Sequence, residues 1–370
     1  MQTRREFLAS TAAAAAVDAK PSGEWRNRQP GVAYRRLGRT GYMVCGMVMG
    51  GNTISPSNYE HVLLALDMGL NYLDTAPAYG RGASEQGYAR VLGARKRDSF
   101  FLNSKVSLWD INRNKLFRDI FNSLPEGEQA KLKAEAAALI AGRRAADPDY
   151  IGNYFAGQRG ELDDAALSNV MEKRYGRQID RDKNYRKLIL DSVDQSLRTL
   201  GTDHLDLLMC PHGANTGYEL ENFPEIFDAF EQLRKSGKVR HFGVSSHTDP
   251  AGVLDAAVKT RQYTAAMVAY NIVNHPYTAD AIARAHKAGL GVIAMKAARP
   301  IHHGRNTGQP NDPARLKLIE DAVPGGSLKP PQKAYLWTLR NPNLSAVISE
   351  LVNAQLVREN LPLASENKPA

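Results

Sequence analysis

Short apolar segments alternate with amphipathic segments along most of the chain. The apolar segments are the predicted strands, which cover residues 46–50, 71–75, 99–105, 205–212, 239–245, 265–270, 291–296 and 345–349. The amphipathic segments have helical spacing. One example ends at Gly201 and carries the apolar stripe Leu190, Val193, Leu197 and Leu200. This alternation is typical of repeated βα units around a parallel sheet.

Eight predicted strands in a chain of 370 residues favour a closed barrel over an open, doubly wound sheet. We therefore predict an α/β fold, a (β/α)8 TIM barrel, with the barrel domain at residues 33–370. Ahead of the first predicted barrel strand, Gly38 and Gly41 flank a turn that predicts an N-terminal β-hairpin. Asp249 and Thr278 are predicted to begin two of the helices. No GxGxxG motif follows a strand and opens a helix, which argues against a Rossmann cofactor site.

Residues 107–184 do not follow the alternation. This segment is long, polar and charged, and its clearest predicted helices cover residues 126–142 and 161–176. It is an insertion in the loop after the third strand, and such loops form the functional face of a β/α barrel. We therefore expect the insertion to lie over or beside the active site. A surface elaboration or an oligomer contact is the alternative.

The N-terminus has the order of features found in an export signal. Arg4 and Arg5 precede an apolar, alanine-rich run that ends in small residues, which predicts a twin-arginine signal peptide at residues 1–19. A disordered or helical tail is the alternative. The signal implies the twin-arginine export machinery as a partner and a periplasmic or extracytoplasmic location, with a cytoplasmic one as the alternative. No other apolar stretch approaches the roughly 18 residues needed to span a bilayer, so we predict no stable membrane anchor.

Charge and cysteine usage exclude two classes of site. The formal net charge of +9 would suit an anionic ligand, but the basic residues are interleaved with acidic ones, so we predict no nucleic-acid binding. Cys45 and Cys210 lie in apolar stretches without metal-ligand spacing and are predicted to be buried free thiols. His302 and His303 share a loop without a nearby carboxylate, which favours a solvated turn over a metal site.

Four polar side chains follow consecutive predicted strands. Asp74 ends the second strand, with Tyr79 five residues further on, Lys105 ends the third, and His212 ends the fourth. A barrel would bring them together at one mouth, because the carboxyl ends of its strands meet there. Each residue alone has an ordinary structural explanation, such as a helix cap, a surface lysine or a packed tyrosine. Their joint placement favours a catalytic site.

These residue types suit the protonation of a carbonyl oxygen during hydride transfer. Free tyrosine, with a pKa of about 10, is too weak an acid without assistance. A nearby lysine cation favours the phenolate, and a carboxylate keeps the lysine charged and oriented. Histidine can direct the carbonyl oxygen or share the proton.

At these residues the chain resembles the aldo-keto reductases. The resemblance runs through GLNYLDTAPAYGRGASEQGYARVLG, the SK of LNSKV, LLMCPH, GVSSH and VRENL, and spans nearly the whole chain apart from the signal and the insertion. Its most specific part is DTAPxYG with a following Ser-Glu pair. It implies a barrel that binds NADP or NAD across its carboxyl-terminal face. It also implies a catalytic tetrad of Asp74, Tyr79, Lys105 and His212, with Tyr79 as the acid in reduction and the base in oxidation.

The resemblance also assigns residues to the nicotinamide and phosphate parts of the cofactor. Ser245 matches the residue that contacts the nicotinamide carboxamide, Asn271 lies near its usual partner, and Ser246 stands where an asparagine is common. Met295 replaces a tyrosine that often stacks on nicotinamide. Lys296 is placed to reach a phosphate as a point charge.

At the adenine end, Glu350 stands where a cation commonly recognises the 2′-phosphate of NADP. A carboxylate there would repel a phosphate but could accept hydrogen bonds from ribose hydroxyls. Glu359 and Asn360 retain the adenine-side pair, and Arg358 is an alternative phosphate ligand. The choice between NADP and NAD stays open at this point.

The predicted function is hydride transfer between nicotinamide and a carbonyl or alcohol substrate, such as an aldehyde, ketone or sugar. A nicotinamide-bound regulatory or binding subunit with little turnover is the first alternative, and a purely structural barrel is the second. Because the twin-arginine route carries proteins that fold before export, we also expect a tightly held cofactor.

Overall fold

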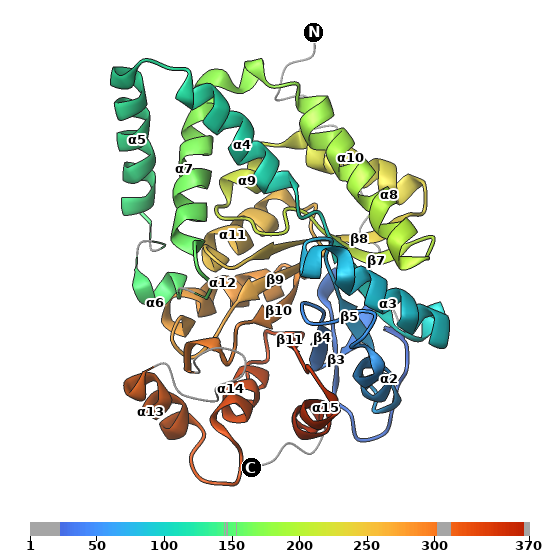
Figure 1. Cartoon of the computed structure of the whole chain (residues 1–370). Coiled ribbons are helices and arrows are strands. Elements are labelled where there is room, and N and C mark those ends of the chain that lie inside the picture. The colour runs from blue at the N-terminus through green and yellow to red at the C-terminus, as the bar shows by residue number, and fades with distance from the viewer. Residues whose placement is uncertain (1–22, 144, 146, 153, 302–311, 366–370) are drawn as a thin grey trace.

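Eight parallel strands close into a barrel in the computed structural model of the chain (Figure 1). Each strand stays within its predicted segment, except for one that extends it by one residue, so the predicted (β/α)8 barrel is confirmed. The strands follow chain order around the barrel: β4 (Met47–Gly50), β5 (Tyr72–Asp74), β6 (Phe101–Lys105), β7 (Leu205–Met209), β8 (Val239–Ser246), β9 (Ala265–Ala269), β10 (Gly291–Met295) and β11 (Ala346–Ser349).

The structure describes residues 23–143, 145, 147–152, 154–301 and 312–365. The predicted signal peptide and the pair His302 and His303 lie outside these residues. Among the residues described, no helix is both long and apolar enough to cross a membrane. The same residues contain no cluster of three or more His, Cys, Asp or Glu that could hold a metal ion. Both cysteines are buried free thiols, as predicted.

Alternate side chains of the strands fill the inside of the barrel. Because neighbouring residues of a strand point to opposite faces, one set packs inward and the other packs outward against the helices. The inward cluster comes from almost every strand and includes Val48, Tyr72, Phe101, Leu207, Met267, Ile293 and Ala346. A barrel filled in this way is a solid core, so a ligand has to bind at one of its ends.

Helices cover the outside of the barrel between successive strands. Asp249 caps α11 as predicted, because its side chain accepts a hydrogen bond from the Gly252 N–H at 3.1 Å. The prediction for Thr278 is wrong, since α12 begins three residues earlier and the Thr278 hydroxyl donates within the helix to the Asn274 carbonyl. The covering helices are α2 (Glu60–Asp67), α3 (Ala83–Ala94), α8 (Leu188–Leu200), α10 (Pro224–Lys235), α11 (Pro250–Thr260), α12 (His275–Lys287), α14 (Pro330–Leu339) and α15 (Ala354–Asn360), with α9 (Tyr218–Glu221) and α13 (Pro313–Ala322) as additions.

A small sheet closes the end of the barrel at which the strands begin. The predicted hairpin is present as antiparallel β2 (Tyr34–Arg36) and β3 (Tyr42–Cys45). Its turn brings Gly38 so close to the first residue of β10 that a side chain there would collide with backbone. A two-residue strand, β1 (Glu24–Trp25), adds to β3 in parallel and was not predicted, because so short a segment has no readable pattern.

The insertion forms a helical layer of its own. In Figure 1, α4, α5 and α7 stand side by side in teal and green next to the barrel. They share a separate apolar cluster that includes Phe117, Leu132, Ile140, Leu162 and Met171. Both helices predicted for this segment are present. The layer consists of α4 (Trp109–Asn122), α5 (Glu126–Ala141), α6 (Pro148–Ile151) and α7 (Gln158–Tyr175).

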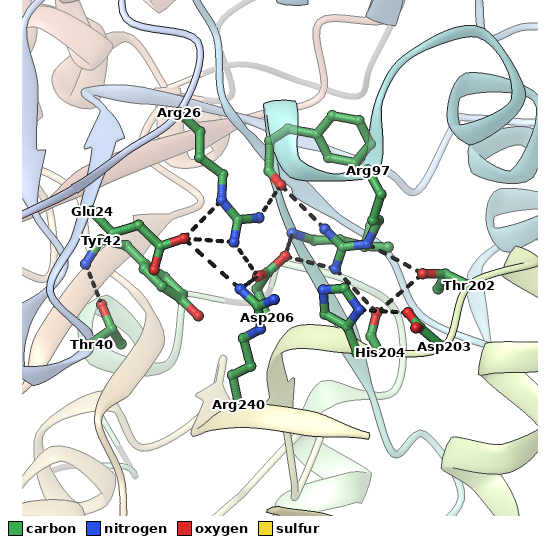
Figure 2. A network of polar contacts seen from close by, with 12 residues as sticks. Glu24, Arg26, Thr40, Tyr42, Arg97, Thr202, Asp203, His204, Asp206 and Arg240 are labelled. Carbon is green, nitrogen blue, oxygen red and sulfur yellow. Dashed lines mark hydrogen bonds and ion pairs between the residues drawn. The ribbon is translucent and has the colours of Figure 1, made fainter. Parts of the chain in front are cut away.

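A buried carboxylate joins the N-terminal sheet to the start of β7 (Figure 2). Asp206 is fully buried and lies 3.0 Å from Arg26, 2.7 Å from Arg97 and 3.4 Å from Arg240, measured between oxygen and guanidinium nitrogen. It also accepts the backbone N–H of Leu102 at 2.9 Å. Glu24 lies 2.7 Å from Arg26 and 3.9 Å from Arg240, so this amino-end network connects four separate segments of the chain through two carboxylates.

Candidate active site

A buried ion pair occupies the opposite end of the barrel, where the strands finish. The Lys105 ammonium lies 2.5 Å from a carboxylate oxygen of Asp74, and both side chains are 1% exposed. Lys105 also donates to the carbonyl of Thr75 at 3.0 Å, and Asn103 donates to the same Asp74 oxygen at 2.5 Å. Because Asp74 and Lys105 end adjacent strands, the barrel itself sets the distance between them.

Burial and pairing act against each other on this ion pair. Burial lowers the pKa of the Lys105 ammonium, and the Asp74 carboxylate offsets part of that shift. Burial likewise raises the pKa of the Asp74 carboxyl, and Lys105 lowers it. Each group therefore opposes the shift that burial imposes on the pKa of the other.

Tyr79 and His212 complete the group of four predicted residues. The Lys105 ammonium lies 4.6 Å from the centre of the Tyr79 ring. The ring centres of Tyr79 and His212 are 5.5 Å apart, and the rings are nearly perpendicular. Burial, followed by the charge of Lys105, lowers the pKa of His212 well below its usual value. The structure thus brings together a cation, a carboxylate, a phenol and a neutral imidazole.

Two further polar side chains at this mouth were missed from the sequence. Asn103 contacts Asp74, and the Ser107 hydroxyl lies 2.8 Å from Nδ1 of His212. Asn103, Lys105 and Ser107 are spaced by two, and residues so spaced on a strand share a face. A polar residue at every second position in a buried segment was the signal that could have revealed them.

Near the predicted carboxamide contacts, the protein already uses most of the polar groups. The Ser246 hydroxyl donates to the Ala214 carbonyl at 2.7 Å and accepts the Asp249 N–H. The Asn271 amide donates to the Tyr154 hydroxyl at 2.8 Å, and its oxygen accepts two backbone N–H groups. The Ser245 hydroxyl makes no hydrogen bond with any described residue. Of the three predicted contacts, Ser245 therefore keeps the freest side chain.

Met295 and Lys296 lie at the end of β10. Met295 is 5% exposed and packs on the cluster inside the barrel, so it forms part of the floor of the mouth. Lys296 has a left-handed backbone, with φ of 62°. Its charge acts on His247, which follows β8 and was not predicted. Nδ1 of His247 is buried without a hydrogen-bond partner in the described chain. The Phe155 ring of the insertion lies at 78° to the His247 ring.

The predicted adenine-end residues gather around α15. The Glu350 carboxylate lies 3.5 Å from the Asn52 amide, while Glu359 accepts hydrogen bonds from Lys329 at 2.9 Å and from Gln355 at 2.8 Å. Asn360 ends the helix and is 6% exposed. Lys329 is thus a cation at this end that the sequence did not indicate, and it is already paired with a carboxylate.

The insertion is fastened to the loops at the mouth. The Tyr150 hydroxyl donates to Asp249 at 2.5 Å, and Gln158 donates to the His247 carbonyl at 3.4 Å. Farther along, the fully buried Arg113 of α4 lies 3.4 Å from Glu219 of α9, the short helix that follows β7. These contacts place the insertion beside the candidate site, on the loops after β7 and β8.

A filled barrel with a polar, partly buried acid–base group at its carboxyl end defines the class of β/α-barrel enzymes, which place their active sites there. A family model, described as the aldo/keto reductase family, matches residues 43–137 and 149–368. The chain therefore belongs to the aldo/keto reductase family and is an oxidoreductase of that type, acting on carbonyl substrates. The matched residues include much of the insertion.

Individual relatives agree with this assignment. The chain is 51% identical over 63 residues to oxidoreductase YdhF of Escherichia coli (strain K12), which is 17% of this chain and 20% of that protein. It is 22% identical over 324 residues to the uncharacterized oxidoreductase YqkF of Bacillus subtilis (strain 168), covering 82% and 81% of the two chains. An aldo-keto reductase from Klebsiella pneumoniae, solved with NADPH, has a TM-score of 0.57 at 17% identity and covers 92% of this chain and 91% of its own.

Proposed function

We propose that this oxidoreductase transfers a hydride between a nicotinamide cofactor and a carbonyl/alcohol pair, with Tyr79 moving the proton. The observation that carries the proposal is the position of Lys105, which is 2.5 Å from the Asp74 carboxylate and 4.6 Å from the centre of the Tyr79 ring. This arrangement provides a held cation beside a phenol in a site that excludes much of the water. A cation so placed favours the phenolate form of a tyrosine.

Each residue of the site has a distinct task in this mechanism. Asp74 holds Lys105 charged, and Lys105 stabilises the negative charge that appears on Tyr79 when it gives up its proton. In reduction Tyr79 protonates the carbonyl oxygen, and in oxidation the phenolate takes the proton back. His212 is neutral and donates a hydrogen bond that orients the same oxygen. The bound nicotinamide supplies or accepts the hydride.

The residues present fit a nicotinamide at the reacting end of the site. The free Ser245 hydroxyl is available to the carboxamide, and Met295 offers an apolar surface for the ring. Asn271 contributes less than predicted, since Tyr154 takes one of its amide hydrogens. The NADPH complex of the Klebsiella pneumoniae enzyme supports a nicotinamide cofactor, either NADP or NAD, in this chain.

Substrate-dependent oxidation or reduction of the nicotinamide tests the proposal. NADPH and NADH are each offered with a panel of aldehydes, ketones and sugars, and with the corresponding alcohols in reverse. The panel includes apolar aldehydes, because Leu108 and Ile111, one and four residues after Ser107, are 58% and 59% exposed. Absorbance changes that vanish in Tyr79→Phe support the mechanism, and activity that survives in this variant contradicts it.

The choice of cofactor is tested at Glu350. If its carboxylate repels a 2′-phosphate, Glu350→Lys binds NADP more tightly than the parent protein does and leaves NAD affinity nearly unchanged. Glu60→Lys makes the same charge change in the exposed first turn of α2 and serves as the control. Unchanged NADP affinity in Glu350→Lys would remove Glu350 from cofactor selection.

We also propose that residues 1–19 direct twin-arginine export and that the exported protein keeps its nicotinamide. The support is the order of Arg4, Arg5 and the apolar run in the sequence. Fractionation of cells that express the full chain is expected to place it outside the cytoplasm, and replacing both arginines by lysine is expected to retain it inside. Denaturing the exported protein should release nicotinamide detectable by mass spectrometry; its absence would contradict retention.

A further inference from the structure

Ser107 connects two loops that carry the proposed reacting side chains. Its hydroxyl lies 2.8 Å from Nδ1 of His212 and accepts the backbone N–H of Ala78 at 3.3 Å. Ala78 directly precedes Tyr79, so one serine joins the Tyr79 loop to the imidazole. Ser107 is 4% exposed, which leaves little room for water to substitute for either partner.

The partners of the hydroxyl determine the direction of its hydrogen bonds. The Ala78 N–H can only donate, so it uses a lone pair of the Ser107 oxygen. His212 Nδ1 is then the only acceptor that described residues offer to the hydroxyl proton. If Nδ1 carried a proton itself, the Ser107 hydroxyl would face two donors and its own proton would be left buried and unpaired, which costs free energy.

We infer that Ser107 is a positioning residue that fixes His212 as the tautomer with its proton on Nε2. A neutral imidazole has one N–H. Because Nδ1 accepts the hydrogen bond from Ser107, that N–H is at Nε2. Nε2 makes no hydrogen bond with a described residue, and the His212 ring adjoins that of Tyr79. The Nε2–H is therefore the group that can donate to a substrate oxygen.

The tautomer matters because the opposite one would reverse the role of His212. With the proton on Nδ1, Nε2 would present a lone pair to the lone pairs of a carbonyl oxygen, and the two acceptors would repel each other. Burial, with Lys105 adding to it, keeps the pKa of His212 low. The doubly protonated ring, in which both nitrogens donate, therefore does not replace the two neutral tautomers. The inference on the reaction rests on the proposed function, whereas the inference on the tautomer does not.

The test reads the tautomer in the protein without substrate. Histidine side chains labelled with nitrogen-15 are recorded by NMR, and the His212 signals are assigned by their loss in His212→Gln. The native protein is expected to show the Nε2–H form alone, Ser107→Ala a mixture of both forms, and Ser107→Thr the native pattern. Ser345→Ala is the matched control, since that serine is also 4% exposed but donates to the Arg36 carbonyl at 2.9 Å.

Kinetics then test the consequence for the reaction. Loss of one neutral hydrogen bond that orients the acid–base group is expected to lower kcat about 5- to 10-fold in Ser107→Ala, with KM nearly unchanged, and Ser107→Thr should restore kcat. A native His212 with its proton on Nδ1, or the same tautomer mixture in native protein and Ser107→Ala, would overturn the inference. If Ser107→Ala changes the tautomer but the native protein reduces no carbonyl substrate, the inference on the tautomer stands and the proposed function is contradicted.

Discussion

The two ends of the barrel each bury a carboxylate against cations, but they do so in different ways. At the mouth, Asp74 has a single cation, Lys105, whose pKa burial can lower. At the amino end, Asp206 has three arginines, Arg26, Arg97 and Arg240, around it (Figure 2). Guanidinium groups stay protonated in proteins, so none of these three cations titrates.

This difference suits the mouth to acid–base chemistry and the amino end to holding the fold together. The lysine pair keeps one partner whose protonation can respond to a neighbour, and it stands beside Tyr79 and His212. The arginine network instead connects the N-terminal sheet to β7, and burial lowers the pKa of its imidazole neighbour, His241. We therefore expect substitutions at the mouth to affect mainly activity. Substitutions in the amino-end network should affect mainly stability.

The largest effect is expected at Tyr79. Tyr79→Phe removes the proposed proton donor and should lower kcat by about 1,000-fold, within the range for loss of general acid–base catalysis, without changing the thermal midpoint. Tyr88→Phe is the matched control, because the Tyr88 hydroxyl is buried without a partner among described residues. If the two variants have equal activity, Tyr79 is not the proton donor.

Breaking the ion pair at the mouth should cost about 3–5 kcal/mol of stability, since Lys105→Met leaves Asp74 buried and unpaired. Adding Asp74→Asn should recover most of that loss, because the amide keeps the Asn103 contact without a charge. The lone carboxyl of the single variant binds its proton more tightly when folded than when unfolded. Its stability should therefore fall as pH rises above the usual Asp pKa.

Denaturant unfolding of the parent, single and double variants near about pH 5 and about pH 8 checks this reasoning. All variants at Lys105 are expected to be inactive. A double variant as unstable as the single one would show that the pair's own charges are not the source of the cost.

At the amino end, a second substitution should not restore the stability that is lost when the Asp206 charge is removed. Asp206→Asn should cost about 2–3 kcal/mol, because hydrogen bonds to a buried charge are lost. Adding Arg97→Met should recover little, since Arg26 and Arg240 still lose their contacts with Asp206 and keep only the Glu24 carboxylate, at 2.7 Å and 3.9 Å. Activity per folded molecule is expected to equal that of the parent. A loss of kcat in the folded variant would mean that the two ends are coupled.

A pH effect on stability is expected from the insertion. Burial, with Glu219 adding to it, raises the pKa of Asp110 in α4 from its usual value of 3.8 to about 8. The folded state then binds a proton that the unfolded state has released, so stability falls as pH rises between those two values. Above pH of about 8, Asp110→Asn should be about 1–2 kcal/mol more stable than the parent, a figure that allows for partial solvent screening. Below the usual Asp pKa the two proteins should be equally stable.

Thermal unfolding across pH measures this gain, and Asp119→Asn is the control. Asp119 belongs to the same helix, but its side chain is 65% exposed. A gain of equal size in both variants would assign the effect to the net charge of the helix instead of to the buried carboxyl.

Periodicity was enough to predict the barrel and the positions of Asp74, Lys105 and His212, for one physical reason. Strands buried on both faces are continuous apolar runs, and a polar residue at the end of such a run has to lie at the mouth. Ser107 escaped notice because it was counted as the first residue of the insertion, although it continues the two-residue spacing of β6.

The partners of Ser246 and Asn271 could not be predicted in this way. Asn271 bonds to Tyr154, which lies 117 residues away in the chain, on an insertion whose pattern reveals its own helices but not the face that it presents to the barrel. A resemblance transfers the identity of a residue, whereas the hydrogen bonds of that residue depend on whatever the rest of the chain places next to it.

The smallest expected effect concerns that contact. Tyr154→Phe leaves an amide N–H of Asn271 buried without its acceptor, which should cost about 1–2 kcal/mol. The loss should appear as faster amide hydrogen exchange in residues 154–158, where the insertion meets the mouth, and not at the amino end. Tyr42→Phe removes a buried hydroxyl that has no partner among described residues at that other end and should cost nothing. Uniformly faster exchange in Tyr154→Phe would instead show that the insertion and the barrel unfold as one unit.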